Sequence, residues 1–404
     1  VAWHGVGETG ELEDVLGRLQ GAAIPASILE RDVLPARVRY SPDRLDALTA
    51  TGEVIWLGRG ALGPRDGRIA LYRRDQVPLI AWDLDIDPPD GPVHDALRSR
   101  LATRGASFFT DLYQAVGGGD PADVVAALWD LVWAGEVTND SLAPLRAVLA
   151  GAKVRAGGAG RATTRGRPRP GRLTRIGPPA GQGRWSLVAP LLHPAPTPTE
   201  AAHAQALQLV ERYGVVTREA VIAEGLVGGF SAVYGVLKVL EERGQVRRGY
   251  FVDGLGAAQF AVPGAVDRLR AARDTPDPVI APDDVPDPVV LASTDPAQPY
   301  GAALGWPDTT GRPARSASSL VVLRAGRPLV WFDRRGHHLV TFPAAMVDPS
   351  WTDALVSLVK HDRVRSVEVR KIDGSGLAEA PAGLLEMLRT AGFVDGYRGL
   401  TFRS

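Results

Sequence analysis

The chain has 404 residues, which exceeds what one hydrophobic core usually supports, so several domains are expected. Its 46 Lys and Arg balance its 46 Asp and Glu, which argues against a protein that binds nucleic acid over its whole surface. The sequence has no Cys and no long uncharged apolar run, which excludes disulfides and thiolate metal sites and argues against a membrane span.

One order of predicted elements occurs three times along the chain. In each copy, two helical segments precede a third helix that ends at a Gly, a short strand opening with Glu or Gln follows, and a second strand returns. The third helices begin at Pro42, Asp120 and Phe230, and their terminal glycines are Gly52, Gly135 and Gly244. This order is typical of the winged helix, a module used mainly to hold nucleic acid. The alternative is three unrelated helical segments.

Residues at the predicted helix ends support the repeat. Ser107 and Thr217 are predicted to cap helices by accepting from free amides, and Asp120 stands before a proline at the first helical position. Gly135 and Gly244 suit a C-terminal stop. Because the third helices of the second and third copies are amphipathic, we expect each of them to pack one face on a β-hairpin.

The second copy carries a basic insertion in its wing, predicted at about residues 147–182. Between Asp140 and Glu200 there is no acidic residue, and the stretch is rich in Gly and Pro, which predicts disorder. The nucleic-acid-binding candidates in it are Arg165, Arg167 and Arg169. A flexible wing loop that scans phosphates and a merely solvated insertion are both open interpretations.

The repeats and the shifts in composition divide the chain into predicted domains. They are a winged-helix module with an extended β-hairpin at residues 1–90, a second module at 91–190, a third at 195–273, an acidic Pro-rich linker at 274–288 and a β-rich, barrel-like domain at 289–404. We therefore predict an α+β, multidomain fold, with tandem winged-helix modules followed by a small mixed β-sheet or β-barrel domain.

Several longer runs resemble the C-terminal region of the bacterial large ATP-dependent helicase-related protein family, Lhr. These runs are Leu128–Asp140, Ala143–Arg146, Gly225–Gly229, Arg247–Phe251, Gly254–Gln259 and Asp295–Gly301. The resemblance extends through nearly the whole chain. It implies a parent enzyme that couples ATP hydrolysis to 3′-to-5′ movement on single-stranded DNA and to unwinding, with a role in DNA repair.

The resemblance also implies that this chain lies beyond the motor. A phosphate loop of the form G-x-x-x-x-G-K-[ST] is absent from the sequence, so we expect neither ATPase activity nor a cofactor or metal here, with ATP and Mg bound in the motor region. A first residue of Val rather than Met fits a piece of a longer polypeptide. The expected partners are single-stranded DNA or a DNA/RNA hybrid, the protein's own N-terminal helicase core and further copies of the chain. A cytoplasmic location is expected, because no signal peptide is visible.

A base-excision glycosylase for uracil or an alkylated base is the alternative function, because the family's C-terminal region resembles AlkZ-type DNA glycosylases. Those enzymes use a Gln-x-Gln pair, which this sequence lacks. Some relatives excise uracil with a carboxylate near the C-terminus, and Asp395 is the catalytic candidate here. An exposed turn aspartate before Gly396 is the other interpretation of that residue. A pure homo-oligomerisation module is a third possibility.

The third copy has the strongest pattern for nucleic-acid binding. The candidates on its third helix and wing are Ser231, Tyr234, Lys238, Arg247, Arg248 and Tyr250. Guanidinium and aromatic groups together suit phosphates and stacked bases. The alternative is that Tyr234 packs in the core and the arginines are solvated. In the second copy, Arg184 beside Trp185 forms a similar but weaker pattern.

Overall fold

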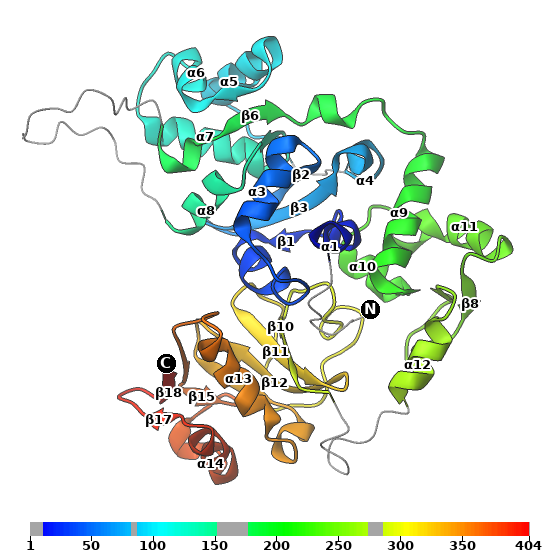
Figure 1. Cartoon of the computed structure of the whole chain (residues 1–404), viewed down its shortest axis with the longest axis vertical. Coiled ribbons are helices and arrows are strands. Elements are labelled where there is room, and N and C mark those ends of the chain that lie inside the picture. Colours follow the sequence, from blue (N-terminus) through cyan, green and yellow to red (C-terminus); the bar gives the residue numbers. More distant parts are fainter. Residues whose placement is uncertain (1–10, 82–86, 152–176, 274–285, 404) are drawn as a thin grey trace, which may run out of the picture. The chain divides into compact units, whose positions relative to one another are not determined.

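The computed structural model describes residues 11–81, 87–151, 177–273 and 286–403, and the chain forms two compact units. Of the described residues, those within 11–30 and 38–205 form the N-terminal unit, and those within 31–37 and 206–403 form the C-terminal unit. Figure 1 labels the helices and strands, coloured along the sequence. Most of the predicted basic insertion (residues 152–176) and of the acidic linker (residues 274–285) lies outside the described residues. In the part that is described, no helix is both long and apolar enough to cross a membrane.

The first copy of the repeat forms a three-stranded antiparallel sheet in the order β1-β3-β2. Its elements are α1 (Leu12–Leu19), β1 (Ile24–Pro25), α2 (Ala26–Ile28), the π-helix η1 (Leu29–Val33), α3 (Pro42–Thr51), β2 (Val54–Ala61) and β3 (Gly67–Arg73). Leu12, Val15, Leu16 and Leu19 are buried on one side of α1, because positions three and four apart share a helix face. The short helices η2 (Arg74–Gln76) and α4 (Val77–Ile80) follow β3.

The second copy has the same order of elements and the strand order β4-β6-β5. Its elements are α5 (Pro92–Arg104), β4 (Ser107–Phe108), α6 (Phe109–Ala115), α7 (Pro121–Trp133), β5 (Val137–Asn139), α8 (Ala143–Leu149), η3 (Pro179–Gly181), β6 (Arg184–Leu187) and η4 (Ala189–Leu192). Asp120 caps α7 by accepting from the Ala122 amide at 2.9 Å, as predicted. The predicted cap at Ser107 is wrong: this residue lies in β4, and its hydroxyl donates to the Gly105 carbonyl.

The third copy repeats the topology with the strand order β7-β9-β8. Its elements are α9 (Pro198–Tyr213), β7 (Val215–Val216), α10 (Arg218–Glu224), α11 (Gly229–Glu242), β8 (Arg247–Gly249) and β9 (Gln259–Ala261), and α12 (Ala265–Arg273) follows. Thr217 caps α10 by accepting from the Ala220 amide, as predicted. The three sheets therefore share one order in which the last strand is central, the arrangement expected of winged helices.

The residues after the linker form two sheets. A six-stranded mixed sheet contains β10 (Val289–Ala292), β11 (Ser319–Arg324), β12 (Arg327–Asp333), β13 (His338–Thr341), β15 (Lys371–Ile372) and β16 (Ser375–Gly376), in that spatial order. A three-stranded sheet contains β14 (Ser366–Val369), β18 (Leu400–Arg403) and β17 (Val394–Asp395). The helices are η6 (Pro343–Met346), α13 (Ser350–Lys360), η7 (Leu377–Glu379) and α14 (Ala382–Thr390), and α13 contacts β10 and β11.

The six-stranded sheet is open. β13 and β15 are parallel and the other pairs are antiparallel, so the predicted mixed sheet is confirmed. The alternative of a barrel is wrong, because β10 and β16 are the two edges and no described strand joins them. The fold is α+β and multidomain, as predicted, whereas the predicted domain boundaries stay a prediction.

Candidate nucleic-acid interface

Helix α11 of the third copy leaves one face exposed. Val233, Leu237 and Leu240 are buried in the core of this copy, at the spacing that lines one side of a helix. Ser231 and Lys238 are exposed, as predicted from the pattern. The helix therefore offers a cation and a hydroxyl on an element whose other side is fixed by packing.

Tyr234 belongs to the core more than to this face. It is half-buried, and its ring lies 5.9 Å from that of Phe260 and 5.7 Å from that of Phe230, measured between centroids. The contact with Phe260 is edge-on and the one with Phe230 is tilted, and aromatic packing of this kind stabilises and holds the ring in place. The packing interpretation of Tyr234 is thus the one that its contacts favour.

The wing of the third copy, between β8 and β9, carries the other candidates. Arg247 is exposed and forms no ion pair with any described residue, and Tyr250 is 87% exposed. The Arg248 Nε atom lies 3.3 Å from the Glu241 carboxylate on α11, so its charge is partly compensated within the protein. Among the named wing residues, Arg247 and Tyr250 are therefore the two that are exposed and not engaged in an ion pair with a described residue.

A residue that sequence reasoning missed, Gln259, holds the backbone of this wing. Its side chain is fully buried, and its Oε1 accepts from the amides of Phe251 and Val252, both at 2.8 Å. Its Nε2 donates to the Val252 carbonyl at 2.9 Å. A polar residue directly before Phe260 in a return strand was the available signal, because a buried amide must find partners.

The candidates of the second copy are less available. Arg184 is held by Asp140, which accepts from its Nε and its backbone amide, both at 2.8 Å. Trp185 is fully buried and donates to the Gly181 carbonyl, so it fills the core. Arg165, Arg167 and Arg169 lie outside the described residues.

The third helix of the second copy, α7, is buried against the first copy. Its Trp129 stacks on Trp56 of β2 at 6.3 Å and lies 5.1 Å from Trp133, between ring centroids. At Gly58 of β2, a Cβ atom would lie 1.8 Å from the Val132 carbonyl oxygen. Helix and strand therefore approach so closely that α7 cannot enter a nucleic-acid groove from this side.

The one cation of the first copy's third helix, α3, is already paired. Arg44 lies 2.8 Å from Glu13 and 3.3 Å from Glu11, and Asp46 lies 2.6 Å from Arg146 on α8. These pairs leave no unmatched cation on α3, so it is a poorer phosphate-binding surface than α11.

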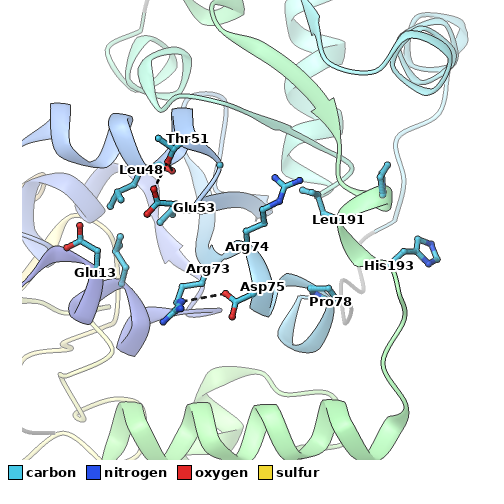
Figure 2. A pocket seen from close by; sticks show the side chains of 14 residues that line it. Glu13, Leu48, Thr51, Glu53, Arg73, Arg74, Asp75, Pro78, Leu191 and His193 are labelled. Atoms are coloured by element: carbon cyan, nitrogen blue, oxygen red, sulfur yellow. Dashed lines mark hydrogen bonds and ion pairs between the residues drawn. The ribbon is translucent and has the colours of Figure 1, made fainter.

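A cavity of about 820 Å³ lies in the N-terminal unit, between α1, the end of α3 and the strands β2 and β3 (Figure 2). Glu13, Glu53 and Asp75 line it together with Arg73 and Arg74, and the Arg73 Nε atom lies 3.5 Å from the Asp75 carboxylate. Three carboxylates against two guanidinium groups give no net positive potential. This cavity is therefore not the nucleic-acid interface that the charge argument requires.

A second cavity, of about 90 Å³, lies in the C-terminal unit. It is lined by Arg334, His337, Ser366 and Glu368, among others. The Glu368 carboxylate accepts from Arg370 at 2.7 Å, and this hydrogen bond is the main cause that lowers the pKa of Glu368. The His337 Nδ1 atom lies 3.7 Å from the same carboxylate. The cavity thus brings an imidazole and an ionised carboxylate together, a pair that sequence order does not reveal.

A buried carboxylate lies beside this cavity. Asp32 is 2% exposed and accepts from Arg334 at 3.0 Å, with Arg363 at 3.4 Å. Burial alone would raise the pKa of Asp32, but the charges of Arg334 and Arg31 and their hydrogen bonds to the carboxylate outweigh burial and lower it. Asp32 is therefore an anion that orders three arginines, because Arg31 also lies 2.9 Å from its carboxylate.

The catalytic candidate, Asp395, is exposed. Its side chain is 74% accessible and pairs with Arg389 at 3.2 Å on the surface of the hairpin. The residue ends β17 directly before the turn at Gly396, so its exposed surroundings agree with the other interpretation given above. A catalytic role for Asp395 stays a prediction.

Two winged-helix domain models of the large helicase-related protein match residues 1–74 and 195–279. The "Lhr helicase/ probable uracil glycosylase" of Mycolicibacterium smegmatis is 41% identical over all of this chain, which covers 28% of that protein. The chain belongs to the Lhr family. The "Lhr helicase/uracil glycosylase" of Escherichia coli is 33% identical over 96% of the chain, which covers 26% of it. The chain is thus the C-terminal region of an Lhr-type protein and spans about a quarter of the length of these relatives.

Among solved structures, Streptomyces sahachiroi DNA glycosylase AlkZ matches with a TM-score of 0.46 and 14% identity, over 90% of this chain and 94% of that chain.

Proposed function

We propose that this Lhr region is a non-motor part of a 3′-to-5′ DNA helicase or translocase that acts in DNA repair, and that it binds and scaffolds nucleic acid. Single-stranded DNA or a DNA/RNA hybrid is bound on the third copy. The observation that carries the proposal is the joint exposure of Lys238 on α11 and of Arg247 and Tyr250 on the wing.

Each of these groups has a chemical task. Lys238 and Arg247 contact phosphates, and release of counterions from the strand makes the binding sensitive to salt. Tyr250 presents an aromatic face on which an unpaired base stacks. The hydrogen bonds of Gln259 fix the wing backbone, so little conformational entropy is lost when the strand binds.

The test is the affinity of the chain for a labelled single-stranded oligonucleotide, measured by fluorescence anisotropy at several salt concentrations. The Lys238→Ala/Arg247→Ala variant is expected to bind more weakly, with the slope of log affinity against log salt reduced by about 0.7 for each lost phosphate contact. The matched control is Arg44→Ala/Arg73→Ala, which removes the same charge from arginines already paired with carboxylates. Equal losses in both double variants would show a general charge effect and contradict the proposal.

A second candidate function is removal of uracil from DNA, because both relatives carry uracil glycosylase in their names. The pairing of His337 with Glu368 beside a small cavity supports this candidate. Incubation with a deoxyuridine-containing oligonucleotide, followed by detection of free base, tests it. Loss of base release in Glu368→Gln or in Asp395→Asn would identify the carboxylate, whereas no release by the unchanged chain excludes this candidate.

Assembly into homo-oligomers and attachment to the helicase core also belong to this proposal. Light scattering over a range of protein concentrations, with and without single-stranded DNA, measures the assembly. We expect no ATP hydrolysis by this chain alone, which a phosphate-release assay checks.

A further inference from the structure

The C-terminal segment repeats the winged-helix topology a fourth time. Helix α13 is followed by β14, then by α14, and the hairpin of β17 and β18 completes the segment. β18 lies between β14 and β17 and is antiparallel to both, which is the strand order of the three earlier copies. The second helix of the other copies is replaced here by β15, β16 and η7.

The end of the third helix carries the same signature in all four segments. A Leu stands four residues before the terminal Gly, and a Val stands two residues after it. The glycines are Gly52, Gly135, Gly244 and Gly392, with φ of 77°, 75°, 73° and 96°. Such left-handed backbone favours glycine, which explains the residue type at each of these positions.

The hydrogen bonds at these glycines agree as well. Each glycine amide donates to the carbonyl three residues earlier, and in the fourth segment Gly392 donates to Arg389 at 2.9 Å. The next amide, that of Phe393, donates to the Leu388 carbonyl at 3.0 Å, as the corresponding amides do in the second and third copies. This is the Schellman pattern of a helix end that turns directly into a strand. The wing of the fourth segment is thus the turn between β17 and β18.

This wing is short and presents two side chains to solvent. The Gly396 amide donates to the Gly399 carbonyl at 2.8 Å, which closes the turn around Tyr397 and Arg398. A Cβ atom at Gly399 would lie 2.2 Å from the Val369 carbonyl, so β14 fixes the base of the turn. Tyr397 is 99% exposed and Arg398 is exposed. Neither side chain contributes to the core, so packing does not explain a tyrosine at this tip.

We propose that Tyr397 and Arg398 form a second contact for single-stranded nucleic acid, in which the tyrosine stacks on an unpaired base and the guanidinium binds a phosphate. The inference rests on the proposed function and deepens it, because it adds a contact outside the third copy. From Arg389 to Arg403 the segment has three arginines against Asp395 alone, so the local charge attracts phosphate. An unpaired strand fits better than a duplex, since a base stacks on a side chain only when its face is free.

The wing of the third copy shows the same combination. There, Arg247 and Arg248 stand just before Tyr250, which is 87% exposed. Two wings of one topology thus each carry an arginine and an exposed tyrosine within four residues. A shared ligand chemistry accounts for both, because stacking and phosphate binding are sequence-tolerant and can be repeated along one strand.

The test uses the full chain and a single-stranded oligonucleotide long enough for several contacts, with the corresponding duplex as a second probe. Tyr397→Ala is expected to weaken binding to the single strand by about 5- to 100-fold, the range of one lost base stack, and to change duplex binding much less. Tyr397→Phe keeps the ring and is expected to retain the affinity. Phe108→Ala removes a 56% exposed aromatic from β4 and is the matched control.

A photochemical readout tests the contact directly. An oligonucleotide that carries 5-bromodeoxyuridine is expected to crosslink to Tyr397 on irradiation, as found by mass spectrometry. If Tyr397→Ala leaves single-strand affinity unchanged while Arg247→Ala weakens it, this inference is overturned and the proposed function stands. If the unchanged chain binds no oligonucleotide, both are overturned. Equal losses in Tyr397→Ala and Phe108→Ala also contradict the inference.

Discussion

Helices α7 and α11 occupy the same place in two copies of one topology, yet they expose different amounts of surface. In α7, buried residues lie on more than one side of the helix. They are Val124, Val125, Ala127, Leu128, Trp129, Leu131 and Val132. In α11 the buried residues are Val233, Leu237 and Leu240, which form a single stripe.

The difference shows how one module serves two roles. Helix α7 packs its own hairpin on one side and β2 of the first copy on the other, where the Thr138 hydroxyl also donates to the Trp56 carbonyl at 2.6 Å. Helix α11 packs its own hairpin and leaves Ser231 and Lys238 to solvent. A winged helix is therefore a structural support when both helix faces are apolar, and a candidate binding surface when only one is.

The largest expected effect follows from removal of the buried Trp129 side chain of α7, which tests whether this helix is a structural support. Trp129 is 5% exposed, contacts three other tryptophans and donates to the Ala180 carbonyl. Trp129→Ala is expected to lower the free energy of unfolding by about 3–5 kcal/mol, because a large cavity forms and the aromatic contacts are lost. Denaturant unfolding followed by circular dichroism measures this. A loss below about 1 kcal/mol would show that α7 is not a structural helix.

A smaller change tests the close approach of α7 to β2. Gly58→Ala places a Cβ atom where the Val132 carbonyl oxygen lies, so the helix must shift, at an expected cost of about 1–3 kcal/mol. Gly17→Ala in α1 is the matched control, since a Cβ atom there meets nothing within 4 Å. The control is expected to stabilise by up to about 1 kcal/mol through helix propensity. Thermal unfolding of the two variants measures both effects. An equal shift of the two unfolding midpoints would contradict the packing argument.

Much of the local structure was predictable because it depends on single residues. Asp120 and Thr217 cap α7 and α10 as predicted, because their side chains satisfy free amides. Gly135 and Gly244 follow the ends of α7 and α11, where glycine adopts positive φ without strain. The predicted cap at Ser107 was wrong, because this residue lies in the short strand β4 and not at a helix start.

What the sequence did not reveal depends on contacts between distant residues. Gln259 orders a wing through hydrogen bonds that exist only once the hairpin has formed, and His337, directly before β13, lies beside Glu368 of β14 only in the folded chain. The fourth copy went unrecognised because its strand β17 has two residues and its second helix is missing, so no periodic pattern marks either. Roles in binding for Ser231, Lys238 and the wing residues stay predictions.

Lys238→Ala tests whether the exposed face of α11 binds phosphate. The residue is exposed, so the variant is expected to unfold with an unchanged midpoint, in contrast to Trp129→Ala. It is expected to weaken binding to single-stranded DNA by about 3- to 10-fold at low salt and to reduce the salt slope by about 0.7, the effect of one phosphate contact. Anisotropy titrations at three salt concentrations measure both quantities. A loss that persists unchanged at high salt would contradict a phosphate contact.

The smallest expected effect separates two neighbouring arginines on the wing. Arg248 is paired with Glu241 of α11, whereas Arg247 has no described carboxylate partner, so Arg248→Ala is expected to weaken binding less than Arg247→Ala. Glu241→Gln releases Arg248 and removes a negative charge that repels phosphate, and we expect about a twofold gain in affinity at low salt. The Glu241→Gln/Arg248→Ala double variant measures the coupling: the gain should be smaller when Arg248 is absent, because only the charge effect of Glu241 then remains. If Glu241→Gln gains equally with and without Arg248, the glutamate acts only through its own charge, and the exposed face of α11, more than the wing, determines how this copy binds.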